Sequence, residues 1–424
     1  MNLRVINGTG SDGRPVTVAV TDGRIAVEAG AGSAGAVVDA AGRMILPGLI
    51  DMHVHYRDPW RDQATPAGET IASGLAAALN GGVTGSACMP NTAPALDTPD
   101  LVRYVIAQGA AAGPGRVWPV AAITRGRQGT ELADLPALRA AGAVAFSDDG
   151  AWLADARLME QALAASRDLG VPVITHAHDE KAWPGWVLHD GAAARRLKVP
   201  GIPSRAEAEM VARDIDIARR TRGRLHVAHV SAGASLAHIR RAKAEGLAVT
   251  CEVTPQHLVL CEDDIPGPDP NYKLAPPLRT AADREALRAA LADGTIDVIA
   301  SDHAPHPPQR KQGFAAAANG VTGVETMLFA VWHALVAPGI VPAARVVDAL
   351  AARPAAILGV AAGRLDPGAS ADLILFDPAP VWACTPAFFR SQSRNSPFAG
   401  RMLQGRIHAI YIAGRAVQRR IAAG

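Results

Sequence analysis

Two histidines separated by one residue, His53 and His55, follow an apolar run near the N-terminus. The run, residues 46–50, predicts a buried strand, and side chains two residues apart on a strand point to the same side. Both imidazoles can therefore face one point, an arrangement that suits a divalent metal such as zinc. Arg57 continues the alternation and brings a fixed positive charge beside that point. Alone, a His-x-His pair is a weak signal, because two ordinary polar residues are the commoner explanation.

Four later apolar runs also end in residue types that bind metals. These ends carry Asp148 with Asp149, His176 with His178, His229, and Asp302. The carboxyl ends of barrel strands meet at one mouth, so the five ends together predict a metal site of four histidines and two aspartates. The alternative for any single residue is a capped or solvated loop position, but five strands ending this way favour the joint site.

Strands and helices alternate between the two terminal regions, which is typical of parallel βαβ units. The other predicted strands are 83–88, 117–123, 143–146, 171–175, 225–230, 248–253 and 298–301, and predicted helices include 70–79, 156–169, 205–221, 235–245 and 281–291. With the strand before His53 this makes eight strands, the number in a (β/α)8 TIM-type barrel. A doubly wound open sheet is the alternative, but no Gly-x-Gly-x-x-Gly follows the first strand.

Both ends of the chain read as short strands broken by turns. Neither end has enough strands to bury a core alone, so residues 1–46 and 364–424 are expected to form one small β-sandwich domain. Residues 47–363 would form the barrel. Two unrelated β appendages are the alternative.

Composition narrows the function. The chain has 424 residues, 49% of them hydrophobic, and a net charge of +2, which gives no case for a nucleic acid or a membrane surface as partner. The four cysteines show no paired spacing, which favours a reducing compartment. Because no signal peptide and no long apolar span is recognisable, a cytoplasmic protein is expected.

Several longer motifs resemble the amidohydrolase superfamily and, within it, the dihydroorotases of the bacterial long-chain type. The resemblance covers essentially the whole chain. The matching motifs are Pro47-Gly-Leu-Ile-Asp-Met-His-Val-His-Tyr-Arg57, Cys88-Met-Pro-Asn-Thr92, Ala145-Phe-Ser-Asp-Asp-Gly150, Gly201-Ile-Pro-Ser-Arg205, His226-Val-Ala-His-Val-Ser231, Glu252-Val-Thr-Pro-Gln-His-Leu258, Pro276-Pro-Leu-Arg279, Ser301-Asp-His-Ala-Pro-His306 and Asn395-Ser-Pro-Phe398.

The resemblance implies roles for the six metal-binding residues. One zinc ion would be bound by His53, His55 and Asp302, and a second by His176 and His229. Asp149 would bridge the two ions. The family pattern favours His176 over His178, because the ligand is the first residue after the strand. It favours Asp149 over Asp148, because the bridge directly precedes a glycine.

The positions of the lysines give independent evidence on which residue bridges the two metal ions. Many amidohydrolases bridge their metals with a carboxylated lysine located between the His-x-His pair and the third histidine. Only five lysines occur here, and the first is Lys181, after His176. The bridge must therefore be Asp or Glu, which argues against the hydantoinases, dihydropyrimidinases and allantoinases that use that lysine.

The resemblance also implies a reaction. A metal-activated water would attack the ring amide of L-dihydroorotate, with Asp302 carrying the proton, as part of pyrimidine biosynthesis. Arg57 would bind the substrate carboxylate. The candidate substrate contacts are His55, Arg57, Asn91, Ala275, His306, Asn319 and Gly320. Ala275 stands where the family usually has Asn, and Trp60 where it often has Gly near the pocket mouth. His306 is alternatively a residue that orients Asp302.

Two other functions stay open on the sequence. One is a hydrolase of another cyclic ureide, of the hydantoinase or allantoinase kind, which Ala275 favours. The other is a catalytically silent partner of aspartate carbamoyltransferase, which the intact set of six ligands disfavours. A homodimer, with a possible aspartate carbamoyltransferase complex, is the expected assembly.

Overall fold

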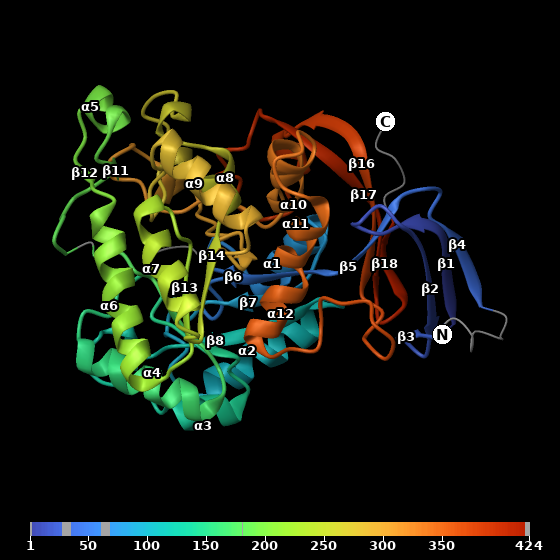
Figure 1. The fold of residues 1–424 in the computed structure, drawn as a ribbon, viewed down its shortest axis with the longest axis horizontal. Helices are drawn as coiled ribbons and strands as arrows, with labels where there is room; N and C mark the ends of the chain where they lie inside the picture. Colours follow the sequence, from blue (N-terminus) through green and yellow to red (C-terminus); the bar gives the residue numbers. More distant parts are fainter. Residues whose placement is uncertain (1, 28–34, 61–67, 180, 420–424) are drawn as a thin grey trace.

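A parallel barrel and a separate β-sheet region make up the chain (Figure 1). The computed structural model describes residues 2–27, 35–60, 68–179 and 181–419. Within these residues, no helix has the length and apolar character needed to cross a membrane. The predicted fold class, a (β/α)8 barrel with a β domain from both termini, is confirmed.

Eight parallel strands form the barrel, in chain order around it. They are β6 (Leu49–Val54), β7 (Val83–Cys88), β8 (Arg116–Ala121), β9 (Ala145–Phe146), β10 (Val173–Thr175), β13 (Leu225–Val227), β14 (Val249–Val253) and β15 (Val298–Ile299). The ring closes just beyond β15, where Val54 pairs in parallel with His303. The backbone N–H of His55 donates to the carbonyl of His303 at 2.8 Å. This closure excludes the open doubly wound sheet.

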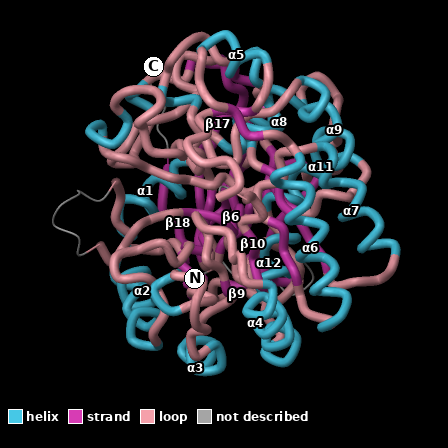
Figure 2. Tube along the Cα trace, turned by 90° about the vertical axis from the view of Figure 1, so that its left-hand side faces the viewer, coloured by secondary structure: helices cyan, strands magenta, loops and turns pink. Residues whose placement is uncertain are grey.

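Helices surround the strands, as the view in Figure 2 shows. They are α1 (Ile71–Asn80), α2 (Pro99–Ala112), α3 (Leu135–Ala141), α4 (Ala156–Leu169), α5 (Ala192–Leu197), α6 (Arg205–Thr221), α7 (Gly233–Ala244), α8 (Pro255–Val259), α9 (Ala281–Ala292), α10 (Met327–Val331), α11 (Ala343–Leu350) and α12 (Ala352–Leu358). Thr70 and Thr280 begin α1 and α9 with capping boxes, which satisfy backbone donors that a helix start leaves free. The predicted helices 156–169 and 205–221 match α4 and α6.

The β domain is one hydrogen-bonded sheet in the order β18-β17-β16-β5-β1-β2-β3, with β4 beside β1. Its strands are β1 (Leu3–Thr9), β2 (Pro15–Thr21), β3 (Arg24–Ala26), β4 (Ala36–Asp39), β5 (Met44–Pro47), β16 (Leu373–Ala383), β17 (Met402–Ile412) and β18 (Arg415–Arg419). The two ends of the chain meet where β5 pairs antiparallel with β16. The domain boundaries at 46/47 and 363/364 stay a prediction, and residues 28–34 and 420–424 of that domain lie outside the described residues.

One expected strand is divided. The apolar run 46–50 predicts a single strand, but the structure ends β5 at Pro47 and begins β6 at Leu49. Gly48 lies between them and packs against β7, where an added Cβ would come within 2.3 Å of the Thr84 hydroxyl oxygen. The run therefore carries the chain from the β domain into the barrel. The short strands β4, β11 (Leu188–His189) and β12 (Gly201–Ile202) were not predicted.

Candidate metal centre and active site

The polar residues predicted from five strand ends lie together at the mouth of the barrel. His53 lies in β6 and His55 just follows it, with ring centroids 5.2 Å apart. Asp149, His176, His229 and Asp302 each lie within three residues of the end of their strand. Short strands that stop at the mouth leave these side chains directed across it, as the barrel geometry requires.

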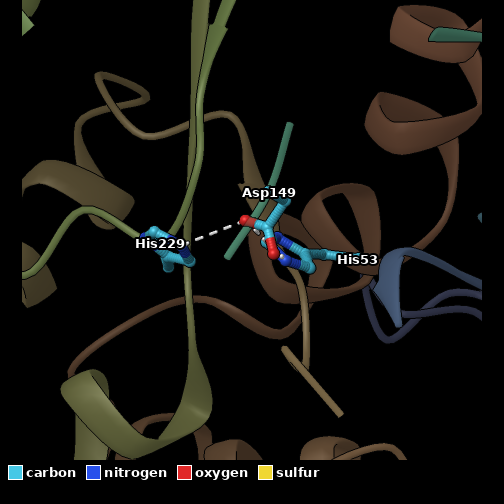
Figure 3. A group of neighbouring side chains, drawn as sticks. All are labelled: His53, Asp149 and His229. Carbon is cyan, nitrogen blue, oxygen red and sulfur yellow. Dashed lines mark ion pairs between the residues drawn. The ribbon is translucent and has the colours of Figure 1, made fainter. Parts of the chain in front are cut away.

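Asp149 lies at the centre of this group. Its Oδ1 is 3.4 Å from His53 Nε2 and 3.6 Å from His229 Nε2, and Figure 3 shows the carboxylate between these two rings. His55 Nε2 is 3.4 Å from Oδ2, and His176 Nδ1 is 3.4 Å from Oδ1. One carboxylate thus contacts four imidazoles that come from three strand ends, those of β6, β10 and β13.

Asp302 follows β15, the last strand of the barrel, which closes the ring beside β6. Its Oδ1 is 3.0 Å from His55 Nε2 and 3.7 Å from His53 Nε2. His53, His55 and Asp302 form one group of ligand atoms that all lie within 4.8 Å of one another, and His53, Asp149 and His229 form another. The two groups share His53.

The two ambiguous pairs separate clearly in space. Asp148 turns away from the histidines and accepts from the backbone N–H groups of Ile123 and Thr124, at 2.9 and 3.1 Å. His178 lies edge-on against Trp186 and contacts Arg279 at 3.4 Å. Asp149 and His176 are therefore the members of each pair that lie in the cluster.

Three residues of the site have left-handed backbone conformations. The φ angles are 54° at Arg57, 34° at His229 and 47° at Asp302. Residues other than glycine rarely adopt this region, and where they do the surrounding structure enforces it, commonly at functional sites. The fold thus holds these three side chains at some conformational cost.

The donor set fits a metal. His53 Nε2 and Asp149 Oδ1 are buried and have no hydrogen-bond partner among the described residues. Burial alone would raise the pKa of Asp149, but the charge of His53 and the other histidines around it hold this pKa well below its usual value. Imidazole nitrogens around an ionised carboxylate are ligands that zinc prefers.

A buried glutamate that sequence reasoning missed supports the cluster from behind. Glu252, on β14, has Oε1 2.5 Å from His53 Nδ1 and Oε2 3.2 Å from His226 Nε2. The backbone N–H of His229 also donates to Oε1, at 3.3 Å. A carboxylate on the far ring nitrogen fixes the orientation of a metal-binding histidine. The motif beginning at Glu252 was recognised, but its spacing does not reveal the contact.

The cluster of histidines and aspartates opens into a cavity of about 260 Å³. All seven predicted substrate contacts line it: His55, Arg57, Asn91, Ala275, His306, Asn319 and Gly320. Arg310, which was not predicted, lines it too. Burial, then repulsion from Arg310, lowers the pKa of Arg57 to about 10, so this guanidinium stays charged at neutral pH. The cavity therefore offers a cation beside the cluster.

Contacts refine three of the expected roles. Asn91 Oδ1 lies 2.8 Å from His55 Nδ1, so Asn91 orients a cluster histidine while it lines the cavity. His306 Nε2 lies 2.7 Å from the carbonyl of Asn319. Burial, then the nearby Arg57, lowers the pKa of His306 to about 2, which makes its ring neutral. Trp60 pairs with the backbone of Ala93 and is not among the described residues that line the cavity.

A closed barrel with histidines and aspartates clustered at its mouth defines the class of metal-dependent barrel hydrolases. The profile of the amidohydrolase family matches residues 44–417, and the chain belongs to that family. It is 46% identical to a dihydroorotase from Pelotomaculum thermopropionicum over 94% of this chain and 93% of that one. A dihydroorotase from Anaeromyxobacter dehalogenans is 45% identical over 98% of this chain and 96% of its own.

Solved structures agree on the fold. An L-hydantoinase (dihydropyrimidinase) from Arthrobacter aurescens superposes with a TM-score of 0.86 at 25% identity, covering 99% of this chain and 96% of that one.

Proposed function

We propose that this protein is a zinc-dependent dihydroorotase that interconverts L-dihydroorotate and N-carbamoyl-L-aspartate in pyrimidine biosynthesis. The observation that carries the proposal is Arg57, a partly buried cation in the same cavity as the His and Asp cluster. A guanidinium in that position suits a substrate that carries a carboxylate beside its ring amide. The dihydroorotases that share more than two-fifths of their residues with this chain support the same reading.

The proposed ligand roles are those that the family resemblance implies, and the geometry of the cluster supports them. His53, His55 and Asp302 would hold one zinc ion, and His176 and His229 a second, with Asp149 between them. The position of Asp149, within 3.4 to 3.6 Å of four histidines, supports two bridged ions. When bound, zinc polarises a carbonyl oxygen and brings the pKa of water close to neutrality.

Protein side chains carry the rest of the reaction. Arg57 binds the substrate carboxylate and so orients the ring amide toward the cluster. Asp302 takes a proton from the attacking water as the new carbon–oxygen bond forms. It then delivers that proton to the ring nitrogen as the carbon–nitrogen bond breaks. In the reverse direction the same carboxylate assists closure of N-carbamoyl-L-aspartate with loss of water.

The test is an assay of zinc-loaded protein on dihydroorotate and on hydantoin, which has a ring amide and no carboxylate. We expect turnover of dihydroorotate and little of hydantoin. Arg57→Met should lower kcat/KM for dihydroorotate by about 10- to 100-fold, because charged hydrogen bonds contribute about 1.5–3 kcal/mol. Protein active on hydantoin and inactive on dihydroorotate would contradict the proposal.

A cyclic ureide hydrolase is the second candidate, and one observation favours it. Ala275 lines the cavity without a polar side chain, so it offers no hydrogen bond to a substrate ring. The hydantoin arm of the assay decides between the two. Zinc-free, inactive protein that binds aspartate carbamoyltransferase would instead support the silent partner.

Assembly and location are further proposals. We propose a homodimer, and a complex with aspartate carbamoyltransferase, on the strength of the family resemblance. A cytoplasmic location is supported by the four cysteines, all buried and unpaired, which suit a reducing compartment. The molar mass in solution, with and without the carbamoyltransferase, tests the assembly.

A further inference from the structure

Two of the five lysines are buried beside the substrate cavity. Lys273 follows a short 3-10 turn (Pro270–Tyr272), and Lys311 ends another (Pro308–Lys311). Their exposed fractions are 6% and 8%, although lysine is among the residues least often buried. The chain carries its basic charge mostly as arginine, so these two positions stand out.

Both ammonium groups donate to main-chain carbonyls of one segment, residues 312–320. Lys273 Nζ donates to Ala315 and Ala317, at 2.6 and 2.7 Å. Lys311 Nζ donates to Ala318 and Gly320, at 2.9 and 3.0 Å. Four carbonyls of a nine-residue stretch are thus bonded to two lysines, a set of contacts that we call the lysine clamp.

Apart from the lysines, the clamped segment is held by a few backbone bonds, by His306 and Asn395, and by the buried side chain of Phe314. Residues 315–318 are four successive alanines, whose side chains make no hydrogen bonds. Backbone bonds fix it at three points, where the N–H groups of Ala317, Ala318 and Gly320 donate to Gly313, Arg310 and Lys273. Removal of Lys273 would take a donor from the carbonyl of the buried Ala317, and removal of Lys311 would take one from that of Ala318, which favours a rearrangement of the segment.

The same segment forms one wall of the substrate cavity. Ala318, Asn319 and Gly320 line it, and the carbonyl of Asn319 contacts the neutral ring of His306. Asn395 joins the arrangement because its side chain donates to Gly320 and accepts from the backbone of His306. Any shift of the segment would therefore move the cavity wall and His306 together.

We propose that Lys273 and Lys311 are positioning residues, which hold segment 312–320 in the conformation that shapes the substrate cavity. The inference rests on the proposed function for its kinetic consequence only. The two lysines do not touch the metal cluster in the structure, so their effect is on substrate binding through the main chain of the segment.

The electrostatics of the clamp support a positioning role over simple packing. Burial and the neighbouring Lys273 lower the pKa of Lys311 to about 7, and only Asp269 opposes them. The other charged groups that interact with His306 nearby are Arg57 and Arg310, which are also cations. Two like charges held together in a buried site cost folding energy, which an apolar residue of similar length would avoid.

Lys273→Met and Lys311→Met test the clamp, because methionine keeps the length of lysine and removes its donors. Hydrogen–deuterium exchange of zinc-loaded protein should become about tenfold faster at the amides of residues 317, 318 and 320, and little elsewhere. For dihydroorotate, KM should rise about tenfold while kcat changes less than about twofold, as expected when uniform binding is lost. Zinc content should stay at the wild-type value.

Lys198→Met is the matched control, because Lys198 is an exposed lysine that ends α5. It should leave exchange and kinetics unchanged. Wild-type exchange at 312–320 in both clamp variants would overturn the proposal, and so would faster exchange with an unchanged KM. Wild-type protein inactive on dihydroorotate would overturn the proposed function alone, while the exchange rates, which need no substrate, would still decide whether the lysines hold the segment.

Discussion

Two aspartates in one site have different surroundings, which separates their roles. The Asp149 side chain is 3% exposed and is surrounded by four histidines, whereas the Asp302 side chain is 14% exposed and has its closest contact with His55. A carboxylate enclosed by cations or metals stays ionised. A carboxylate at the edge of the cavity can exchange a proton with substrate. We therefore propose Asp302 as the residue for proton transfer and Asp149 as the bridge.

Asp302→Asn removes the proton carrier and keeps the shape of the side chain. We expect kcat on dihydroorotate to fall about 10²- to 10⁴-fold, the usual contribution of a general acid or base. Circular dichroism should be unchanged, and elemental analysis should still find zinc in the protein. Turnover within a few-fold of wild type would mean that another group carries the proton.

Protons compete with metal at His53. Burial lowers the pKa of this ring, but Asp149 and Glu252 outweigh burial and raise it well above its ordinary value. The metal-free protein therefore holds a proton there at neutral pH, and metal binding must release it. Zinc affinity should weaken as the pH falls, by about tenfold or more between about pH 8 and about pH 6. Competition with a fluorescent chelator measures this, and an affinity independent of pH would contradict it.

At the scale of elements, β14 connects the two halves of the cluster. Its Glu252 contacts the ring of His53 from β6 and the backbone of His229 after β13. Glu252→Gln would replace the carboxylate that contacts His53 Nδ1 with a neutral amide. The negative charge beside the ring would be lost, and the orientation of the ring would be disturbed. Zinc affinity should fall about 10- to 100-fold, as is typical when such a supporting group is lost.

The control is another buried glutamate. Glu325 is 1% exposed and accepts hydrogen bonds from Asn80 and from the backbone N–H groups of Arg390 and Ser391, none of which is a candidate ligand. Glu325→Gln should alter stability and leave zinc affinity unchanged. Equal losses of affinity in both variants would mean that Glu252 acts only through folding.

The sequence predicts site residues that have a local signal, and it does not predict contacts between residues far apart in the chain. Strand ends such as His176 and Asp302 could be predicted, because each follows its own apolar run. Glu252 could not, since its partner His53 is 199 residues away and a glutamate inside a strand has no local signal. The four carbonyls bonded by the buried lysines are likewise invisible in sequence, because any residue type provides a carbonyl.

Gly48 lies within the apolar run 46–50, and the sequence does not reveal that this glycine packs closely against Thr84. Gly48→Val should destabilise the protein by about 1–3 kcal/mol, because the new side chain would overlap Thr84 of β7. Chemical denaturation measures the change. Gly267→Ala is the control, since a Cβ at Gly267 meets no atom within 4 Å, and it should be close to neutral.

At the scale of the whole molecule, one buried cluster joins the barrel to the β domain, and a second cluster, which includes Leu3, Val5 and Tyr411, lies within the terminal sheet. A single cluster of buried apolar residues includes Phe329 and Trp332 beside the barrel together with Phe376 and Ile407 of the terminal sheet. The rings of Trp332 and Phe376 lie 4.8 Å apart. Continuity of this kind couples the stability of the two parts, because neither can open without exposing apolar surface of the other.

A polar contact joins the same two parts. Arg116, at the start of β8, forms an ion pair with Asp372, the residue before β16, and also donates to Ser370 at 3.1 Å. Asp372 is 2% exposed and accepts from the backbone of Ala413 at 2.8 Å. Removal of this carboxylate would cost the guanidinium its ion pair and leave the backbone N–H of Ala413 without its acceptor, which is unfavourable at a largely buried site.

We therefore expect the metal-free protein to unfold in one transition. Far-ultraviolet circular dichroism and tryptophan fluorescence should give the same midpoint in urea, because Trp118 lies in β8 and Trp382 in β16. Asp372→Ala should lower the free energy of unfolding by about 3 kcal/mol, which moves the midpoint to a lower urea concentration. The midpoints from the two probes should still coincide. Two separated transitions in the wild type would show that the β domain folds independently of the barrel. The shared core would then be a contact between two stable units.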